Sequence, residues 1–327
     1  MRAPFSRVAS FPDMETAEQY RLFSAAEVRG RSALYERLSA EVADDPALVA
    51  LLDELPPIKR QPNLFFGAAR FLGAPLDGDF RAWTIAHWPD VRDAMLTRRT
   101  QTNEVGRCAV LLPVLARIPG PLALIEVGAS AGLCLSLDRY RYVYDDGHAV
   151  QVVGDGPVEL RCRTNGRVPL PDRLPEVVWR AGIDLNPLDV SDDDAMRWLE
   201  TLVWPGQDDR LARLRAAIDV TRRDPPRLVQ GDLNEALPGL LAEAPPDATV
   251  VVFHSAVLPY VNPDDRDRFV ASMGRLPVRW ISNEASFRLP VLAEQVAVPA
   301  GRMLFLVALD GEPLAVADPH GAHLDWI

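Results

Sequence analysis

Lysine and cysteine are scarce in this chain. Lys59 is the only lysine among 35 basic residues, so no lysine nucleophile is available elsewhere in the chain. The three cysteines, Cys108, Cys134 and Cys162, are widely spaced and odd in number. This pattern predicts reduced thiols in a cytoplasmic protein and not a disulfide framework or a zinc site. We therefore expect no bound metal.

Long apolar runs and an excess of positive charge are also missing. No run of 18 or more apolar residues occurs, and the first residues lack the apolar core of a signal peptide, so we expect no membrane partner. The net charge of -11 argues against a nucleic-acid partner, because phosphate binding needs a basic surface. A small-molecule substrate remains the expected partner, and the oligomeric state stays open.

The chain changes character near residue 119. Residues 13–117 have apolar positions at helical spacing, which predicts a helical N-terminal domain, residues 1–118, acting as a lid or wall. Residues 119–327 alternate strands and helices, which is typical of a parallel α/β sheet, apart from a β-hairpin insertion expected at 139–170. The predicted strands are Leu122–Val127, Glu176–Asp184, Arg227–Gln230, Thr249–His254, Val278–Asn283 and Met303–Leu309, with a closing strand to Val316.

The first predicted strand leads into a turn of small residues. The strand carries an acid, Glu126, and small residues at every second position follow at Gly128, Ser130 and Gly132. A strand, a tight turn and a helix in this order form the arrangement in which nucleotide-like ligands lie against a helix N-terminus. Glycine there permits positive φ and a close approach of ligand to backbone.

Two interpretations of this turn predict other chemistries. The segment 128–132 matches the G-x-S-x-G nucleophile elbow, with Ser130 as nucleophile and His320 or His323 as the later histidine of a serine hydrolase. That fold, however, places several strands before its elbow, whereas the residues before 119 in this chain are predicted to be helical. A dinucleotide-binding turn would instead need a third glycine and an acid after the second strand, and Asp145 lies in a segment predicted to be a hairpin.

The third interpretation is an S-adenosylmethionine site of the class I methyltransferase type. Glu126 would accept from the cofactor's ammonium group, while Gly128, Ser130 and Gly132 make room for its amino-acid end. Asp184 ends the next strand, where it would chelate the ribose hydroxyls. The other expected contacts are Leu185 against the adenine edge, Asp232 accepting from the adenine amino group, and Leu233 beside it.

Three residues are candidates for catalysis. His254 ends a run of four β residues at the carboxyl edge, where a general base would lie, although a core histidine is an equal alternative. Glu284 would orient a substrate amine or hydroxyl, or else pair with Arg288, and Tyr260 would line the same cleft.

Three residues before the first strand are candidates for substrate binding. Asn103, Glu104 and Arg107 lie on the segment that would cover the methionine end of the cofactor. The alternative is a capped helix start with an internal pair between Glu104 and Arg107.

The chain also resembles a bacterial family of unknown function over nearly its whole length. The resemblance implies an α/β fold similar to class I methyltransferases, a Rossmann-like sheet preceded by the helical domain, but no substrate. We therefore expect methyl transfer to a small molecule, with a non-catalytic or regulatory Rossmann-fold protein as the alternative. The segments that carry the resemblance are Gln61–Asn63, Gln101–Arg107, Leu124–Tyr140, Arg180–Pro187, Trp198–Pro205, Gly231-Asp232, His254–Tyr260 and Trp280–Glu284.

Overall fold

The structure is a computed structural model that describes residues 14–101, 103–285, 296 and 304–327. The chain divides into two compact units. The first contains residues 1–102 and 193–212, and the second contains residues 103–192 and 213–327. Residues 103–118, which we grouped with the N-terminal helices, thus cluster with the sheet.

The first unit is helical in the part that the structure describes. Its helices pack around a core rich in aromatic rings, in which Tyr20 and Phe80 each contact the pair Phe65 and Phe66. Side chains of Ser32 and Asp79 accept hydrogen bonds from backbone N–H groups at helix starts, which the helix itself leaves unpaired. The helices are α1 (Thr16–Leu22), the π-helical turn η2 (Phe23–Glu27), α2 (Ala33–Asp44), α3 (Pro46–Asp53), the 3₁₀ turn η3 (Pro57–Lys59), α4 (Pro62–Phe71), α5 (Phe80–Ala86), α6 (Trp88–Thr97), α8 (Asp193–Thr201) and the start of α9 (Asp208–Arg223).

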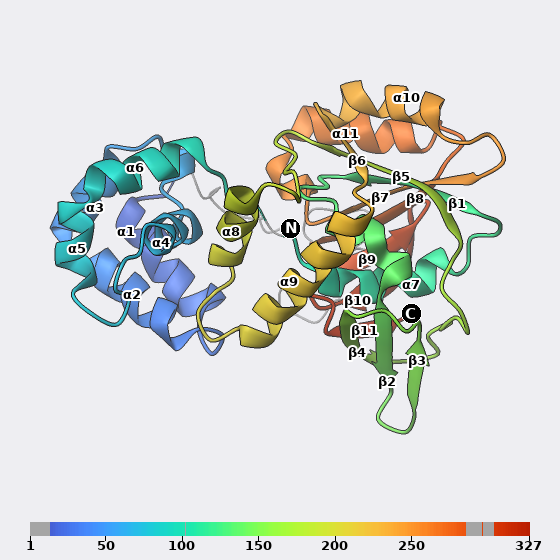
Figure 1. Ribbon diagram of the computed structural model, residues 1–327, viewed down its shortest axis with the longest axis horizontal. Helices are drawn as coiled ribbons and strands as arrows, with labels where there is room; N and C mark the ends of the chain where they lie inside the picture. The colour runs from blue at the N-terminus through green and yellow to red at the C-terminus, as the bar shows by residue number, and fades with distance from the viewer. Residues whose placement is uncertain (1–13, 102, 286–295, 297–303) are drawn as a thin grey trace, which may run out of the picture. The chain divides into compact units, whose positions relative to one another are not determined.

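The second unit is built on one large, mostly parallel sheet (Figure 1). In the described residues its strands follow the order β3-β2-β4-β11-β10-β9-β8-β7-β1-β5-β6. The strands are β1 (Leu122–Val127), β2 (Arg141–Asp145), β3 (Val150–Val153), β4 (Glu159–Asn165), β5 (Val177–Asp184), β6 (Arg227–Gln230), β7 (Thr249–Ser255), β8 (Arg279–Ala285), β9 (Phe305–Leu309), β10 (Glu312–Ala317) and β11 (His323–Trp326).

Helices cover both faces of this sheet. Helices α10 (Leu233–Glu243) and α11 (Pro263–Met273) lie together over one face, where their apolar side chains join those of β1, β5, β7 and β8 in a single core (Figure 1). Helix α7 (Cys108–Leu115) packs on β4, β8 and β9. In the described part of the chain, no helix has both the length and the apolar character needed to cross a membrane.

The strand order reverses between β1 and β7. From β1 the chain proceeds to β5 and β6 on one side, and then to β7 and β8 on the other. All five strands run parallel. In open α/β sheets, ligands bind beyond the carboxyl ends of the strands at such a reversal, so this edge is the place to look for a site.

Most predicted elements of the second unit are present, and the mixed α/β class is confirmed. The last predicted strand begins at residue 303, which lies outside the described residues, and β9 begins at Phe305. Strands β2 and β3 pair antiparallel as a hairpin. Strand β4 then runs parallel to β2, and the unpredicted β11 joins β4 to β10, so the 139–170 region extends the main sheet.

Candidate functional site

The small-residue turn after β1 needs glycine for conformation and for packing. Gly128 and Gly132 have φ of +73° and +70°, values that L side chains rarely adopt. A Cβ on Gly128 would lie 2.3 Å from Cγ2 of Val257, and one on Gly132 would lie 2.6 Å from Cγ of Pro226. Ser130 is also left-handed, with φ of +52°. The turn is therefore tightly packed on its Val257 and Pro226 sides.

Two predicted site residues hold this turn in place. Asp184, at the end of β5, accepts from the backbone N–H of Ser130 through Oδ2 and of Asn186 through Oδ1, both at 2.8 Å. The amide of Asn103 donates to Ser130 Oγ at 2.8 Å and accepts from the N–H of Ala131 at 3.0 Å. The structure thus brings Asn103, Ser130 and Asp184 together at the carboxyl ends of β1 and β5.

Glu126 is a buried carboxylate at the end of β1. Only 6% of the residue is exposed, and its Oε2 is closed to solvent with no hydrogen-bond partner among the described residues. Burial raises the pKa of Glu126 well above its ordinary value, the Cys134 thiol and the Asp184 carboxylate raise it further, and Arg107 opposes them. Burial therefore favours the neutral, protonated form of Glu126 unless a cation lies beside it.

Arg107 is a buried guanidinium near the same edge. Its Nε donates to the carbonyl of Pro319 at 2.9 Å and its Nη1 to the carbonyl of Ser255 at 3.1 Å. The guanidinium lies 5.7 Å from the ring centroid of Phe305. Among the contacts of the described residues there is no ion pair between Glu126 and Arg107, although Arg107 lowers the pKa of Glu126.

Strand alternation separates the predicted site residues onto two faces of the sheet. Glu126 lies opposite Gly182, so Asp184, two residues further along β5, lies on the same face. Val127 lies opposite His254. His254 therefore lies on the α10 and α11 face, away from Glu126. On β8, His254 lies opposite Ser282, so Glu284, two residues further along, lies on that face too.

His254 is enclosed by hydrogen bonds on both ring nitrogens. Its Nδ1 lies 2.7 Å from Oε1 of Glu284, and its Nε2 lies 3.1 Å from the indole nitrogen of Trp280. Because the indole N–H only donates, Nε2 accepts and the proton lies on Nδ1, which makes the imidazole neutral. His254 and Glu284 are fully buried. Neither nitrogen is open for the proton transfer expected from the sequence.

The remaining predicted cofactor and catalytic residues differ in exposure. Leu185 and Tyr260 are 60% and 77% exposed, with Tyr260 at the end of the 3₁₀ turn η6 (Leu258–Tyr260). Asp232 caps α10, since its Oδ1 accepts from the N–H of Asn234 at 2.8 Å. Leu233 is buried in the core that α10 shares with the sheet.

Glu104 has different partners from those expected. Its Oε1 accepts from the N–H of Gly106 at 3.1 Å and from Nη2 of Arg213 at 3.3 Å. Its Oε2 lies 3.5 Å from Nδ1 of His320. Arg213 lies on α9, more than a hundred residues away in the chain, so local spacing gave no signal for this contact. The internal pair with Arg107, which was the alternative to substrate binding, is absent from the ion pairs of the described residues.

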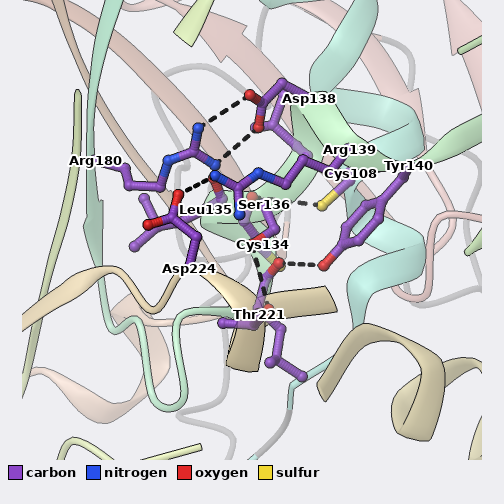
Figure 2. Close-up of polar contacts among 12 residues, drawn as sticks. Cys108, Cys134, Leu135, Ser136, Asp138, Arg139, Tyr140, Arg180, Thr221 and Asp224 are labelled. Carbon is purple, nitrogen blue, oxygen red and sulfur yellow. Dashed lines mark hydrogen bonds and ion pairs between the residues drawn. The ribbon is translucent and has the colours of Figure 1, made fainter. Parts of the chain in front are cut away.

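Behind the turn, the 3₁₀ segment η5 (Leu133–Arg139) is anchored by polar contacts (Figure 2). Arg180 of β5 donates to both carboxylate oxygens of Asp138, at 2.9 and 3.0 Å, and to the carbonyl of Leu135 at 3.0 Å. The hydroxyl oxygens of Ser136 and Thr221 lie 3.2 Å apart and share a hydrogen bond, and Arg139 forms an ion pair with Asp224. Together these contacts fix the segment that follows the glycine turn.

The described residues contain no group of three or more histidine, cysteine or acidic side chains placed to bind a metal ion.

The sequence analysis missed two residues of this edge, Val257 and Asn283. Asn283 is fully buried and donates to Ser255 Oγ at 2.9 Å, while its Oδ1 has no partner in the described part of the chain. A polar residue at the end of an apolar strand was the available signal for Asn283, whereas nothing local marked Val257.

Comparison with known proteins identifies a family and no activity. No curated protein matches the chain. The sequence model of one bacterial family matches residues 73–326, well over half of the chain. The chain belongs to this family, which is described as "Uncharacterized protein conserved in bacteria (DUF2332)".

Proposed function

We propose that this chain binds S-adenosylmethionine at the carboxyl ends of β1 and β5 and transfers its methyl group to a small molecule. In this proposal, the parallel strands β6-β5-β1-β7-β8 form a Rossmann-like sheet of the class I methyltransferase type. The reversal of strand order between β1 and β7 supports a ligand site at this edge. One departure is the connection from β1 to β5, which passes through strands β2 to β4 in place of a single crossover helix.

The observation that carries the proposal is a buried acid with an unpaired oxygen near a guanidinium at this edge of the sheet. Oε2 of Glu126 is buried without a hydrogen-bond partner among the described residues, and the guanidinium of Arg107, which donates to two backbone carbonyls, lies close enough to lower the pKa of Glu126. Leaving a buried polar group unpaired costs about 1–3 kcal/mol, and more when the group is charged. A zwitterion would suit both groups, because its ammonium would favour the ionised form of Glu126 and its carboxylate would pair with Arg107. The amino-acid end of S-adenosylmethionine has this character, whereas NAD does not.

Asp184 and Leu185 fit the nucleoside end of the same ligand. Each carboxylate oxygen of Asp184 accepts one backbone N–H, and a carboxylate has about four acceptor positions, so two remain for the ribose hydroxyls. The exposed Leu185 follows directly and offers an apolar surface for the adenine. Asp232 uses one oxygen to cap α10, and its second oxygen is left for the adenine amino group.

When bound, the cofactor supplies a methyl group already activated by its sulfonium. The residues of the chain then bind, orient and exclude water. Because both nitrogens of His254 are occupied, the chain offers no histidine base at this position. We infer an acceptor that attacks without prior loss of a proton, as a carboxylate does.

A binding or regulatory protein is the second candidate. The packing of Val257 on Gly128 favours it, because this contact explains the glycine without a ligand. A serine hydrolase has less support. A nucleophilic serine needs a base within hydrogen-bond reach, and Ser130 Oγ accepts from the amide of Asn103, which takes up no proton.

Calorimetric titration with S-adenosylmethionine, S-adenosylhomocysteine and NAD tests the proposal. We expect the sulfur compounds to bind at micromolar concentration, about -8 kcal/mol, and NAD not to bind. Glu126→Gln keeps the shape and removes the charge, so it should weaken binding about tenfold or more, which is about 1.4 kcal/mol. Glu312→Gln, at an exposed position in the same unit, is the matched control and should bind as the parent does. Absence of binding by both sulfur compounds would overturn the proposal.

A further inference from the structure

One buried carboxylate oxygen accepts from two backbone N–H groups of the loop after β7, beside the bond from the N–H of Ala256 to the carbonyl of Asn283. Oε1 of Glu284 accepts from the N–H of Val257 at 2.9 Å, from the N–H of Leu258 at 3.3 Å and from Nδ1 of His254 at 2.7 Å. Ala256, at the start of this loop, has φ of +59°, a conformation that costs a non-glycine residue energy. The loop thus keeps a strained conformation that Glu284 stabilises through two backbone contacts.

The orientation of Glu284 is set in turn by a buried side chain. Trp280 donates to Nε2 of His254 at 3.1 Å, which leaves the proton on Nδ1 and directs it at Glu284. His254 and Glu284 are completely buried, and Oε2 of Glu284 has no hydrogen-bond partner among the described residues. A fully buried carboxylate with one oxygen unsatisfied lowers stability. Packing alone therefore gives no reason to keep an acid there.

The loop meets the glycine turn at one side chain. Cγ2 and Cγ1 of Val257 lie 2.3 and 3.1 Å from the position that a Cβ on Gly128 would occupy. Val257 therefore packs directly against Gly128 and fills the space on that side of the turn. In the proposed function, the amino-acid end of the cofactor lies over this turn.

We propose that Glu284, oriented by His254, is a positioning residue that holds Val257 against Gly128 and so preorganises the turn for its ligand. This inference rests on the proposed function and deepens it. It gives His254 and Glu284 a role in binding that needs no proton transfer. A loop ordered before binding loses less conformational entropy when the ligand arrives.

The test combines amide hydrogen exchange with S-adenosylhomocysteine affinity in Glu284→Gln, Val257→Ala and the double variant. Glu284→Gln should speed amide exchange at Val257 and Leu258 and weaken S-adenosylhomocysteine binding about tenfold. Val257→Ala should weaken binding by a similar factor. If Glu284 acts through Val257, the double variant should lose about tenfold and not the hundredfold of independent effects. Glu312→Gln again serves as the control.

The outcomes separate this inference from the proposed function. Losses that multiply in the double variant, or faster exchange in Glu284→Gln with unchanged affinity, would overturn the positioning role and leave the cofactor site standing. A parent protein that binds no S-adenosylhomocysteine would overturn the proposed function and this role together. If Glu284→Gln does not fold, Trp280→Phe removes the donor that orients His254. The loop amides should then exchange faster, and unchanged exchange would contradict the proposal.

Discussion

Replacing Gly128 with alanine tests the packing of the glycine turn most directly. At φ of +73°, an alanine costs about 1–2 kcal/mol in backbone conformation alone. Its Cβ would also lie 2.3 Å from Cγ2 of Val257, and overpacking of this kind costs about 1–3 kcal/mol. We therefore expect Gly128→Ala to lower the free energy of unfolding by about 2–5 kcal/mol.

Two companion variants separate these contributions. Gly311→Ala has a similar φ of +83° and nothing within 4 Å of the added Cβ, so only the conformational cost of about 1–2 kcal/mol should remain. In a Val257→Ala background the contacts at 2.3 and 3.1 Å are removed and only the Cβ of residue 257 remains, at 3.3 Å, so Gly128→Ala should then cost only slightly more than Gly311→Ala. The double-mutant cycle between positions 128 and 257 should give a coupling of about 1–3 kcal/mol.

Urea unfolding followed by tryptophan fluorescence measures these free energies. Because the chain forms two units, the slope of the transition must be compared among variants before free energies are extracted. If Gly128→Ala costs no more than Gly311→Ala, the contact with Val257 does not constrain the turn. If Val257→Ala fails to reduce the cost of Gly128→Ala, the reasoning from the 2.3 Å approach is refuted.

Three further outcomes are expected. The pKa of Glu126 is raised in the folded chain, so its contribution to stability is full below the unfolded pKa and is lost as pH rises through the folded pKa. In urea unfolding over a pH series, Glu126→Gln should not show this loss. Parallel curves of unfolding free energy against pH for parent and variant would contradict the prediction. Arg180→Leu leaves Asp138, whose side chain is 15% exposed, without its bidentate partner. The variant should lose about 3–5 kcal/mol of unfolding free energy in thermal or urea unfolding, and adding Asp138→Leu should recover much of that loss. Trp280→Phe leaves Nε2 of His254 buried without a donor and should cost about 1–3 kcal/mol beyond the lost packing, while nitrogen NMR of the parent should show the Nδ1–H form of this histidine.

The local features of the fold could be read from the sequence. The apolar runs of β1, β5, β6, β7 and β8 are chain-local signals, and the structure has strands at these positions as predicted. Small residues after Glu126 predicted a tight turn, which the positive φ values confirm. Such features depend on steric preferences and hydrogen bonds within a few residues, so a sequence specifies them without knowledge of the rest of the molecule.

Only the tertiary structure decided which side chains meet. Glu126 and His254 each lie near the end of a strand, yet the register of β1 against β7 places Val127 and not Glu126 opposite His254. Glu284 lies on the same face as His254, so the two acids Glu126 and Glu284 are on different faces of the sheet. The contacts of Glu104 with Arg213 and of Gly128 with Val257 likewise join segments more than a hundred residues apart. Side-chain alternation has a period of two, so a single step of register reverses the face. The sequence by itself therefore determined the strands and their polar ends. The pairing of strands determined which polar ends face the glycine turn and which are enclosed beneath α10 and α11, because pairing depends on contacts that no local pattern encodes.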